Sequence, residues 1–539
     1  MQGARRQVQS ARRGREDRPA SRTRRAVQAL DYTLAIVSGV LLALSFPRFG
    51  HAAVALGAVV PVLVAVSGWR GRPGVHPGQT FRRGAMLGAL TGVVHYAGTI
   101  YWTGAVVETF GGLPAIVALM CAFALAAYMA AYTALACGLI AATVRALGTS
   151  GLAIAPFAWV AAEFARGHVL GGFPWIPLGS AVVTLLPVAQ LASVLGVYGL
   201  SGFLVTLATL IAVALTCAGT TRVATASLAA GLLAVVSVWG AARVADGELT
   251  RAGTPITVGL IQPNISQAQK WDRAMAGEIA RRYEALTRRA VADGADVVLW
   301  PESATPYMFD EDPIQAEAVR RLVRESGVPL LFGTDEVERG TPTRFYNSAF
   351  MLDPTGAVAA VYRKIQLVPF GEFVPLKSLL FFVSPLVDAV ADFAPGTRVT
   401  MLPVQGHMAS TAICYEVVYP HLIRQAVLEG AELLTTITND AWYGTSSAPY
   451  QHFELASMRA IEQGRYLARA ANTGISGLID PYGRVIVKTG VFEEAVVTAE
   501  ARFLQGRTLY ATIGDAVALV SLAVALVAAG WLTLARPAR

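Results

Sequence analysis

Cysteine, histidine and charged residues are all scarce in this chain of 539 residues. It has four cysteines and seven histidines, with no Cys-X-X-Cys pair and no cluster of these residues at metal-ligand spacing. These absences exclude a disulfide framework and give no support for a metal site, so we expect neither a metal nor a cofactor. Lys, Arg, Asp and Glu make up only 15% of the residues, whereas soluble globular proteins carry about 25%. The chain is therefore not an ordinary soluble protein.

Long apolar runs take the place of the missing charge. Hydrophobic residues make up 54% of the sequence and the mean hydropathy is +0.49. Most of them fall in residues 29–246 and 511–535, in runs near the roughly 20 residues that cross a bilayer core. The segment 250–506 between them has ordinary charge density. We predict about eight membrane-spanning helices, at roughly 29–46, 52–69, 84–107, 113–144, 151–167, 188–217, 224–244 and 511–535.

The formal net charge of +8 does not indicate nucleic-acid binding. Arginines concentrate in residues 1–28 and recur in every second loop between the apolar runs. Cytoplasmic loops of membrane proteins carry this excess of basic residues. We therefore expect both termini in the cytoplasm, segment 250–506 as an extracytoplasmic domain, and no nucleic-acid partner. The tail 1–28 is interpreted as a basic cytoplasmic topology determinant.

Strand-like and helix-like runs alternate in the polar domain. This order predicts a sheet covered by helices, in which functional residues gather just beyond the strand ends. The predicted strands are 256–261, 297–300, 329–332, 348–352, 407–414 and 433–437, and the predicted helices are 270–292, 313–326, 420–428 and 453–471.

Three residues of the polar domain could form a nucleophilic site. Cys414 is the only cysteine outside the apolar runs, and it lies at the end of a predicted strand, while Glu302 lies just beyond the end of another. A thiol is mostly protonated at neutral pH, so it needs a nearby base before it can attack a substrate. Glu302 could take that proton, and Lys364 could stabilise a thiolate or an oxyanion. Taken singly, each residue also has a structural interpretation, as a buried thiol, a cap or surface carboxylate, and a solvated charge.

Two pairs of polar residues lie inside the apolar runs. Glu163 and Arg166 lie one helical turn apart in the fifth run, where an ionisable pair is either functional or a structural pairing. His95 and Tyr96 in the third run are expected to pack or hydrogen-bond between helices.

The motifs around the three residues resemble those of a known superfamily. Trp300-Pro-Glu302, Tyr362-Arg-Lys364 leading into Pro369-Phe-Gly-Glu-Phe-Val-Pro375, and Cys414-Tyr-Glu416 are similar to the Glu-Lys-Cys signature of the nitrilase superfamily. With the flanking apolar runs, residues 29–535 resemble the apolipoprotein N-acyltransferase family. The resemblance implies an α/β domain of α-β-β-α sandwich type, joined to a polytopic helical membrane bundle.

The resemblance also implies roles for individual residues. Glu302 would be the general base, Lys364 the oxyanion-stabilising ammonium and Cys414 the nucleophile. Four further residues match supporting positions of the site, namely Glu372, Glu416, Tyr415 and Asn347. Three aromatic residues match positions linked to substrate entry, although an ordinary interfacial or core role is equally open for Trp271, Trp442 and Trp175.

The implied reaction moves an acyl chain from a phospholipid, through a Cys414 thioester, to the α-amino group of an S-diacylglyceryl cysteine in an apolipoprotein. Such a protein would be a monomer in the bacterial cytoplasmic (inner) membrane. The apolar stretch 376–387 is interpreted as an arm or lid that dips into the outer leaflet through Phe381 and Phe382, or else as a buried core helix. Two alternatives stay open: a membrane-tethered carbon-nitrogen hydrolase of small substrates, and a transporter whose triad is vestigial.

Overall fold

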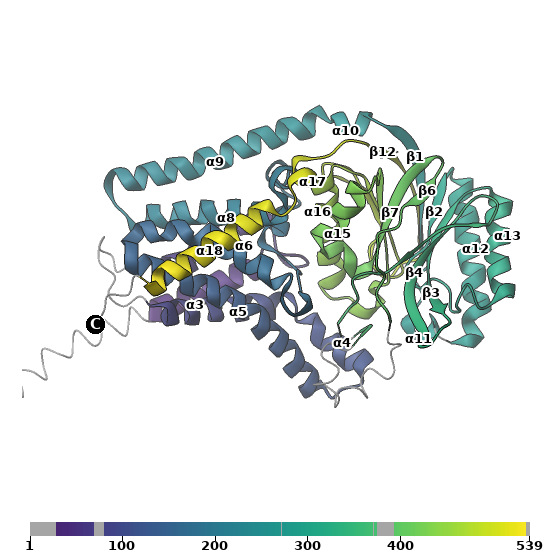
Figure 1. The fold of residues 1–539 in the computed structure, drawn as a ribbon, viewed down its shortest axis with the longest axis horizontal. Coiled ribbons are helices and arrows are strands. Elements are labelled where there is room, and N and C mark those ends of the chain that lie inside the picture. Colours follow the sequence, from purple (N-terminus) through teal and green to yellow (C-terminus); the bar gives the residue numbers. More distant parts are fainter. Residues whose placement is uncertain (1–28, 69–79, 271, 370, 374–392, 535–539) are drawn as a thin grey trace, which may run out of the picture.

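A helical bundle and a two-sheet domain lie end to end in the computed structural model (Figure 1). It describes residues 29–68, 80–270, 272–369, 371–373 and 393–534. Residues 376–387, with Phe381 and Phe382, and Trp271 lie outside the described residues.

The bundle is built from the apolar runs before the polar domain and from the last run. Its elements are a helix at Ala29–Ala43, η1 (Ala52–Leu56), α2 (Val60–Ser67), α3 (Phe81–Thr99), α4 (Trp102–Gly111), α5 (Ala115–Leu147), η2 (Gly148–Ile154), α6 (Ala155–Arg166), η3 (Val169–Gly171), η4 (Leu178–Val182), α7 (Leu186–Ala189), α8 (Ala192–Thr216), α9 (Gly219–Asp246), α17 (Leu509–Ile513) and α18 (Ala516–Leu534).

Helices α3 and α5 pack closely because small residues line their contact. A Cβ atom on Gly88 of α3 would lie 2.5 Å from the carbonyl oxygen of Thr133 in α5. Any larger residue at this position would push the two helices apart. Small residues of this kind let transmembrane helices approach each other in the absence of a hydrophobic driving force.

Four helical segments of the described residues are long and apolar enough to cross a membrane: Ala115–Arg166, Ala192–Thr216, Gly219–Arg251 and Ala516–Leu534. Two shorter apolar helices lie at Ala29–Ala43 and Ala52–Ser67. The predicted run 84–107 is divided between α3 and α4, and 151–167 contains the short helix α6. The total of about eight spans therefore stays a prediction.

The polar domain contains two six-stranded sheets. In the first, with strand order β12-β1-β2-β3-β4-β5, strands β1, β2 and β3 are parallel. In the second, with strand order β11-β10-β9-β8-β7-β6, strands β7, β8 and β9 are parallel. The strands are β1 (Thr254–Gln262), β2 (Val297–Leu299), β3 (Leu330–Glu338), β4 (Arg344–Leu352), β5 (Val358–Arg363), β6 (Leu402–Val404), β7 (His407–Ile413), β8 (Leu433–Thr438), β9 (Leu467–Ala471), β10 (Gly477–Ile479), β11 (Val485–Lys488) and β12 (Ala495–Phe503).

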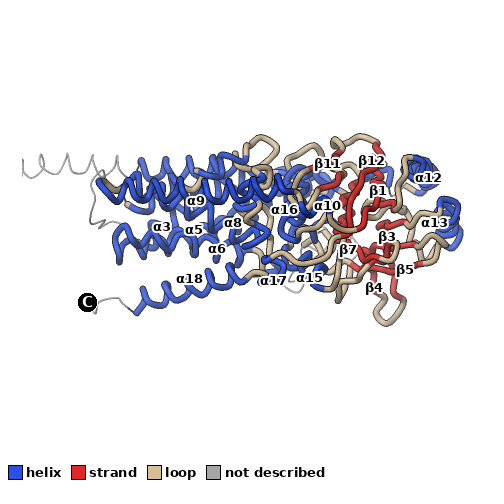
Figure 2. Tube along the Cα trace, turned by 90° about the horizontal axis from the view of Figure 1, so that it is seen from above, coloured by secondary structure: helices blue, strands red, loops and turns tan. Residues whose placement is uncertain are grey.

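Helices cover the outer faces of both sheets, so the expected α-β-β-α sandwich is confirmed. Helices α12 (Ala276–Ala292) and α13 (Pro313–Ser326) lie on the side away from the bundle. Helices α15 (Pro420–Leu428) and α16 (Ala448–Gln463) lie between the second sheet and the bundle (Figure 2). Apolar side chains such as Val258, Leu331 and Ile413 fill the space between the sheets.

The bundle and the inner helical layer share one hydrophobic core. Trp175 and Leu200 of the bundle belong to the same buried cluster as Tyr415, Leu422 and Phe453 of the polar domain. Burying apolar surface across this boundary stabilises one relative position of the two bodies. The sandwich is therefore seated on the bundle and not merely tethered to it.

One predicted helix was wrong in its second half. The helix expected at 453–471 ends at Gln463, because Gly464 adopts a left-handed conformation with φ +60° and closes the helix. The following residues Leu467–Ala471 form the buried central strand β9. The predicted helices 313–326 and 420–428 are confirmed as α13 and α15.

Candidate active site

Cys414 lies at the sharp turn that follows β7. The strand ends at Ile413, and the 3-10 helix η7 (Cys414–Val418) begins at the cysteine itself. The backbone of Cys414 has φ +54°, a left-handed conformation that is uncommon for a residue with a side chain. Such strained residues persist only where the surrounding structure holds them. The turn is therefore a fixed feature, and it buries the residue to 5% exposure.

Glu302 follows β2 on the facing sheet. The preceding Trp300 is held by its ring stacked on Tyr283 at 4.5 Å and by a hydrogen bond from its indole N–H to Thr287 at 2.9 Å. Strand β3 passes so close that a Cβ on Gly333 would lie 2.6 Å from the Cα of Glu302. These contacts fix the backbone from which the carboxylate of Glu302 projects.

Lys364 directly follows β5 and joins two carboxylates. Its Nζ donates to Oε1 of Glu302 at 3.2 Å and to Oε1 of Glu372 at 2.8 Å. Asn347 of β4 bonds the same two oxygens through Nδ2, at 2.8 Å and 2.9 Å. The second sheet completes the arrangement, since the backbone N–H of Asn439 donates to Oε2 of Glu302 at 2.9 Å. The structure thus brings Glu302, Lys364, Glu372 and Asn347 together.

The electrostatics of the site favour a charged Lys364–Glu302 pair beside a neutral thiol. Burial acts against both charges, yet Lys364 and Asn347 hold the pKa of Glu302 below its ordinary value. Burial also opposes the charge of Lys364, but Glu302 and Glu372 raise the pKa of this ammonium well above its usual range. Burial and the nearby Glu302 raise the pKa of the Cys414 thiol, while Lys364 lowers it. The thiol is therefore protonated at rest, and an ionised base stands ready to accept its proton.

Glu416 forms hydrogen bonds both to the Cys414 turn and to the segment that follows Lys364. One carboxylate oxygen accepts hydrogen bonds from the backbone N–H groups of Ile365 and Gln366 and from the Tyr362 hydroxyl, at 2.6, 3.0 and 2.8 Å. The other accepts from the backbone N–H of Ile413 at 2.7 Å. Glu416 thus holds the two sides of the site at a fixed separation.

We expect Glu416→Gln to destabilise the protein by about 2 kcal/mol, because an amide presents N–H groups to donors that then lose their acceptor. A lower midpoint of thermal unfolding in detergent would show this. Glu429→Gln provides the control, since Glu429 is exposed at the end of α15. Equal midpoints for the two variants would contradict the prediction.

A second buried lysine beside the site was missed by the sequence analysis. Lys270, at the end of α11 (Gln267–Lys270), is 4% exposed, and its Nζ donates to the backbone carbonyl of Glu302 at 3.1 Å. Burial lowers the pKa of Lys270 to about 8, although Glu302, Asp335 and Cys414 act to raise it. Burial likewise raises the pKa of Asp335 to about 6. The only sequence signal was one lysine at the start of an amphipathic stretch.

Lys270→Met should move the acidic limb of the pH–rate profile to higher pH. The ammonium lowers the pKa of Glu302, so its removal lets the carboxyl protonate at a higher pH, by about one pH unit. Rates of acyl-enzyme formation between pH 4 and 8 would measure this shift. Lys270→Arg keeps the charge and should leave the limb in place; an unshifted limb in both variants would disprove the effect.

Aromatic residues of the bundle and of the domain meet next to Cys414. Trp175, fully buried in the loop before η4, stacks on Tyr415 with ring centroids 6.4 Å apart. Trp442, in η8 (Asp440–Tyr443), contacts Phe110 of α4 edge-on at 4.6 Å. Trp175 and Trp442 therefore both lie at the boundary between the two bodies.

Glu163 and Arg166 hold the loop that carries Trp175. Arg166 donates to the carbonyl oxygen of Trp175 at 2.7 Å and lies over the Tyr96 ring at 5.4 Å. Glu163 accepts from the backbone N–H of Leu178 at 2.8 Å. His95 of α3 packs against another segment of the bundle through Phe46, with ring centroids 5.7 Å apart. The two charged residues thus act by anchoring backbone, each on its own part of the loop.

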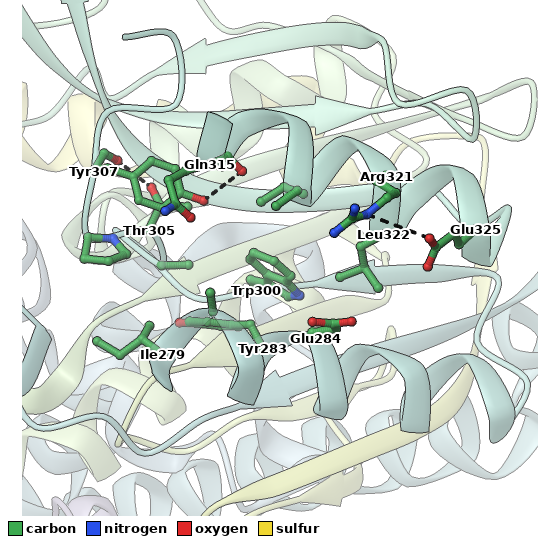
Figure 3. Close-up of a pocket in the computed structure, with 15 residues that line it drawn as sticks. Ile279, Tyr283, Glu284, Trp300, Thr305, Tyr307, Gln315, Arg321, Leu322 and Glu325 are labelled. Carbon is green, nitrogen blue, oxygen red and sulfur yellow. Dashed lines mark hydrogen bonds and ion pairs between the residues drawn. The ribbon is translucent and has the colours of Figure 1, made fainter. Parts of the chain in front are cut away.

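A separate pocket lies on the opposite side of the sandwich. It is lined by Ile279 and Tyr283 of α12, by Gln315 and Leu322 of α13, and by Trp300 (Figure 3). These helices form the layer farthest from the bundle (Figure 1). The pocket is therefore remote from the bundle side, on which Tyr415 meets Trp175.

The two parts of the chain match two family models. Residues 257–506 match the carbon-nitrogen hydrolase family, and residues 38–210 match the N-terminal domain of apolipoprotein N-acyltransferase. A crystal structure of an amidase from Nesterenkonia sp. aligns with 48% of this chain and 93% of its own, at 23% identity and a TM-score of 0.37. The fold and the site define a nitrilase-like domain built onto an apolar helical bundle.

Relatives that match nearly the whole chain show which family within this class the protein belongs to. Apolipoprotein N-acyltransferase of Geobacter metallireducens is 40% identical over 94% of this chain and 95% of its own. The enzyme of the same name from Methylococcus capsulatus is 34% identical over 89% of this chain and 92% of its own. The chain belongs to the apolipoprotein N-acyltransferase family.

Proposed function

We propose that this protein transfers a fatty acyl chain from a phospholipid to the α-amino group of the S-diacylglyceryl cysteine of an apolipoprotein, through a thioester on Cys414. The observation that carries the proposal is the buried ammonium of Lys364, bonded to Glu302 and Glu372 beside the strained Cys414 turn. Membership in the apolipoprotein N-acyltransferase family supports the choice of substrates.

The first half-reaction forms the thioester. Glu302 takes the thiol proton while the sulfur of Cys414 attacks the ester carbonyl of the phospholipid. Lys364 stabilises the negative oxygen of the tetrahedral intermediate. When the ester C–O bond breaks, Glu302 returns the proton to the departing alkoxide, and a lysophospholipid leaves.

The second half-reaction consumes the thioester. The α-amino group of the acceptor attacks the acyl carbonyl, and Glu302 accepts a proton from the nitrogen. The C–S bond breaks, the thiolate regains the proton from Glu302, and an amide is released. Because both half-reactions use the same base and the same oxyanion site, one set of residues serves donor and acceptor in turn.

The membrane bundle suits a reaction whose donor is a lipid and whose acceptor is anchored to a lipid. We place the protein in the bacterial cytoplasmic (inner) membrane as a monomer with about eight spans, both termini in the cytoplasm and the sandwich outside. Arginine-rich loops support this orientation. The proposed divisions are a basic tail at 1–28, a bundle at 29–246, a catalytic domain at 250–506 and a last helix at 511–535. Trp175 and Trp442 would line substrate entry, together with Trp271, Phe381 and Phe382.

Transfer can be tested against hydrolysis with one labelled donor. Purified protein is incubated with phospholipid labelled in its acyl chain and with a diacylglyceryl peptide, and the products are resolved by mass spectrometry. We expect the label on the peptide N-terminus. An N-acetylated peptide is the control, since it has no free amine and should stay unlabelled. Label released only as free fatty acid would refute the proposal and favour the tethered hydrolase.

A further inference from the structure

The side chain of Gln451 on α16 makes four hydrogen bonds to the bundle. The side chain of Gln451 is buried, at 2% exposure. Its Oε1 accepts from the indole N–H groups of Trp102 and Trp175, at 3.3 and 2.8 Å. Its Nε2 donates to the carbonyl oxygens of Pro47 and Thr99, at 3.2 and 3.0 Å. A side-chain amide has two donors and two acceptor positions, so the bundle alone satisfies the whole amide.

The next residue, His452, forms a hydrogen bond with the backbone of Cys414. The Nε2 atom of His452 lies 3.0 Å from the carbonyl oxygen of Cys414. Because a carbonyl can only accept, this nitrogen carries the proton. The Nδ1 atom then accepts from the Arg469 guanidinium at 3.0 Å, and the same guanidinium nitrogen donates to Asp440 at 2.8 Å. All three side chains are fully buried or nearly so, and the ring is fixed on both sides.

The first turn of α16 is fastened to the bundle by a further contact. The hydroxyl of Tyr101 lies 3.0 Å from the Ser447 hydroxyl and accepts from the Ser447 backbone N–H at 3.3 Å. Trp175 also covers His452, with ring centroids 5.5 Å apart. The bundle therefore contacts α16 both at its first turn and beside the His452 side chain.

We propose that Gln451 and His452 form a two-residue link through which the membrane bundle positions the Cys414 turn. The inference rests on the proposed role of Cys414 as the nucleophile. The left-handed backbone at Cys414 is costly for a residue with a side chain, so an outside restraint must maintain it. His452 supplies a hydrogen bond to that peptide unit, and Gln451 fixes the helical turn from which His452 projects. Both act as positioning residues and take no part in bond making.

The link can be tested by single-turnover acylation of the full-length protein in mixed micelles. The acyl-enzyme is measured by intact mass at several phospholipid concentrations. Gln451→Leu removes all four bonds to the bundle, and Gln451→Glu keeps only the acceptor half. Gln463→Leu is the matched control, because this glutamine is buried on the same helix and its side-chain amide has no hydrogen-bond partner among the described residues.

We expect Gln451→Leu to lower the maximal acylation rate by about 10- to 100-fold relative to Gln463→Leu, the size of effect that small misplacements of reacting groups produce. Gln451→Glu should fall between the two. The maximal rate is the readout of the link, and not the half-saturating phospholipid concentration, because Gln451 also holds Trp175, which is proposed to line substrate entry. At position 452, Gln can still offer an N–H to the Cys414 carbonyl and should retain most of the rate, whereas Phe should lose it.

Two results would overturn the link. Equal maximal rates for Gln451→Leu and Gln463→Leu would show that the bundle contacts do not reach the nucleophile. Equal rates for His452→Gln and His452→Phe would show that the bond to the Cys414 carbonyl has no positioning effect. Failure of the wild-type protein to gain acyl mass on Cys414 is a separate result, which would remove the proposed function and this inference with it.

Discussion

Replacing Cys414 with Ala should abolish the acyl mass that we expect the wild-type protein to gain on exposure to phospholipid. The thioester has no other attachment point in the proposed reaction, so acyl transfer should fall by about 10⁴-fold or more, as it does when a covalent catalyst loses its nucleophile. The measurement is intact mass before and after treatment with hydroxylamine, which cleaves thioesters. The wild-type increment should disappear on that treatment.

Two controls make the Cys414 result specific. Cys137→Ala removes a buried thiol from α5 and should leave the increment unchanged. Cys414→Ser keeps a small hydroxyl at the same turn, and an increment there should resist hydroxylamine because it would be an oxygen ester. A wild-type-sized, hydroxylamine-sensitive increment in Cys414→Ala would place the acyl chain on another residue and end the proposal.

Local signals in the sequence were sufficient for parts of the fold. Helix α13 begins at Pro313, where a missing N–H costs nothing. The Asp312 side chain caps its first turn, and Gly327 follows its last residue in a left-handed conformation. The same kind of signal was present at Gly464, but the predicted helix was continued through it to Ala471. Strand β9 is buried on both faces, so its residues carry no alternation that separates it from a helix.

Some residues of the candidate site could be predicted from the sequence and others could not. Glu302, Lys364 and Cys414 follow strands and stand in recognisable motifs, so the sequence pointed to them directly. Gln451 and His452 stand in a helix whose residues are nearly all buried, and no local pattern shows which segments of the bundle they meet. The partners of Gln451 lie hundreds of positions away in the chain, as Pro47 does, and His452 bonds Cys414 across 38 positions. Such contacts become visible only when the two bodies are placed together.

The substitution Lys364→Met should have the second large effect, because it removes the ammonium that the carboxylates of Glu302 and Glu372 share. Lys364 is 1% exposed, and breaking a buried ion pair by removing one partner costs about 3 to 5 kcal/mol. Acyl-enzyme formation at neutral pH should fall by about 10³-fold, since the oxyanion loses its cation. Lys364→Arg keeps the charge and should lose less stability, although its larger planar group will not restore the rate.

The pH dependence of the Glu302 contribution to stability should reverse in Lys364→Met. In the wild-type protein the pKa of Glu302 is held below its unfolded value, so its contribution to stability is present above the unfolded pKa and is lost as pH falls through the folded pKa. Without Lys364, we expect burial, the largest influence on this carboxyl, to outweigh Asn347 and Lys270 and to raise the pKa of Glu302 above the unfolded value. Stability is then greatest at low pH and is lost as pH rises through the new folded pKa. Unfolding midpoints of both proteins at pH 5 and pH 8 test this, because the other buried carboxyls are common to the two. The loss of stability relative to the wild type should be larger at pH 8, and an equal loss at the two pH values would show that Lys364 does not control the ionisation of Glu302.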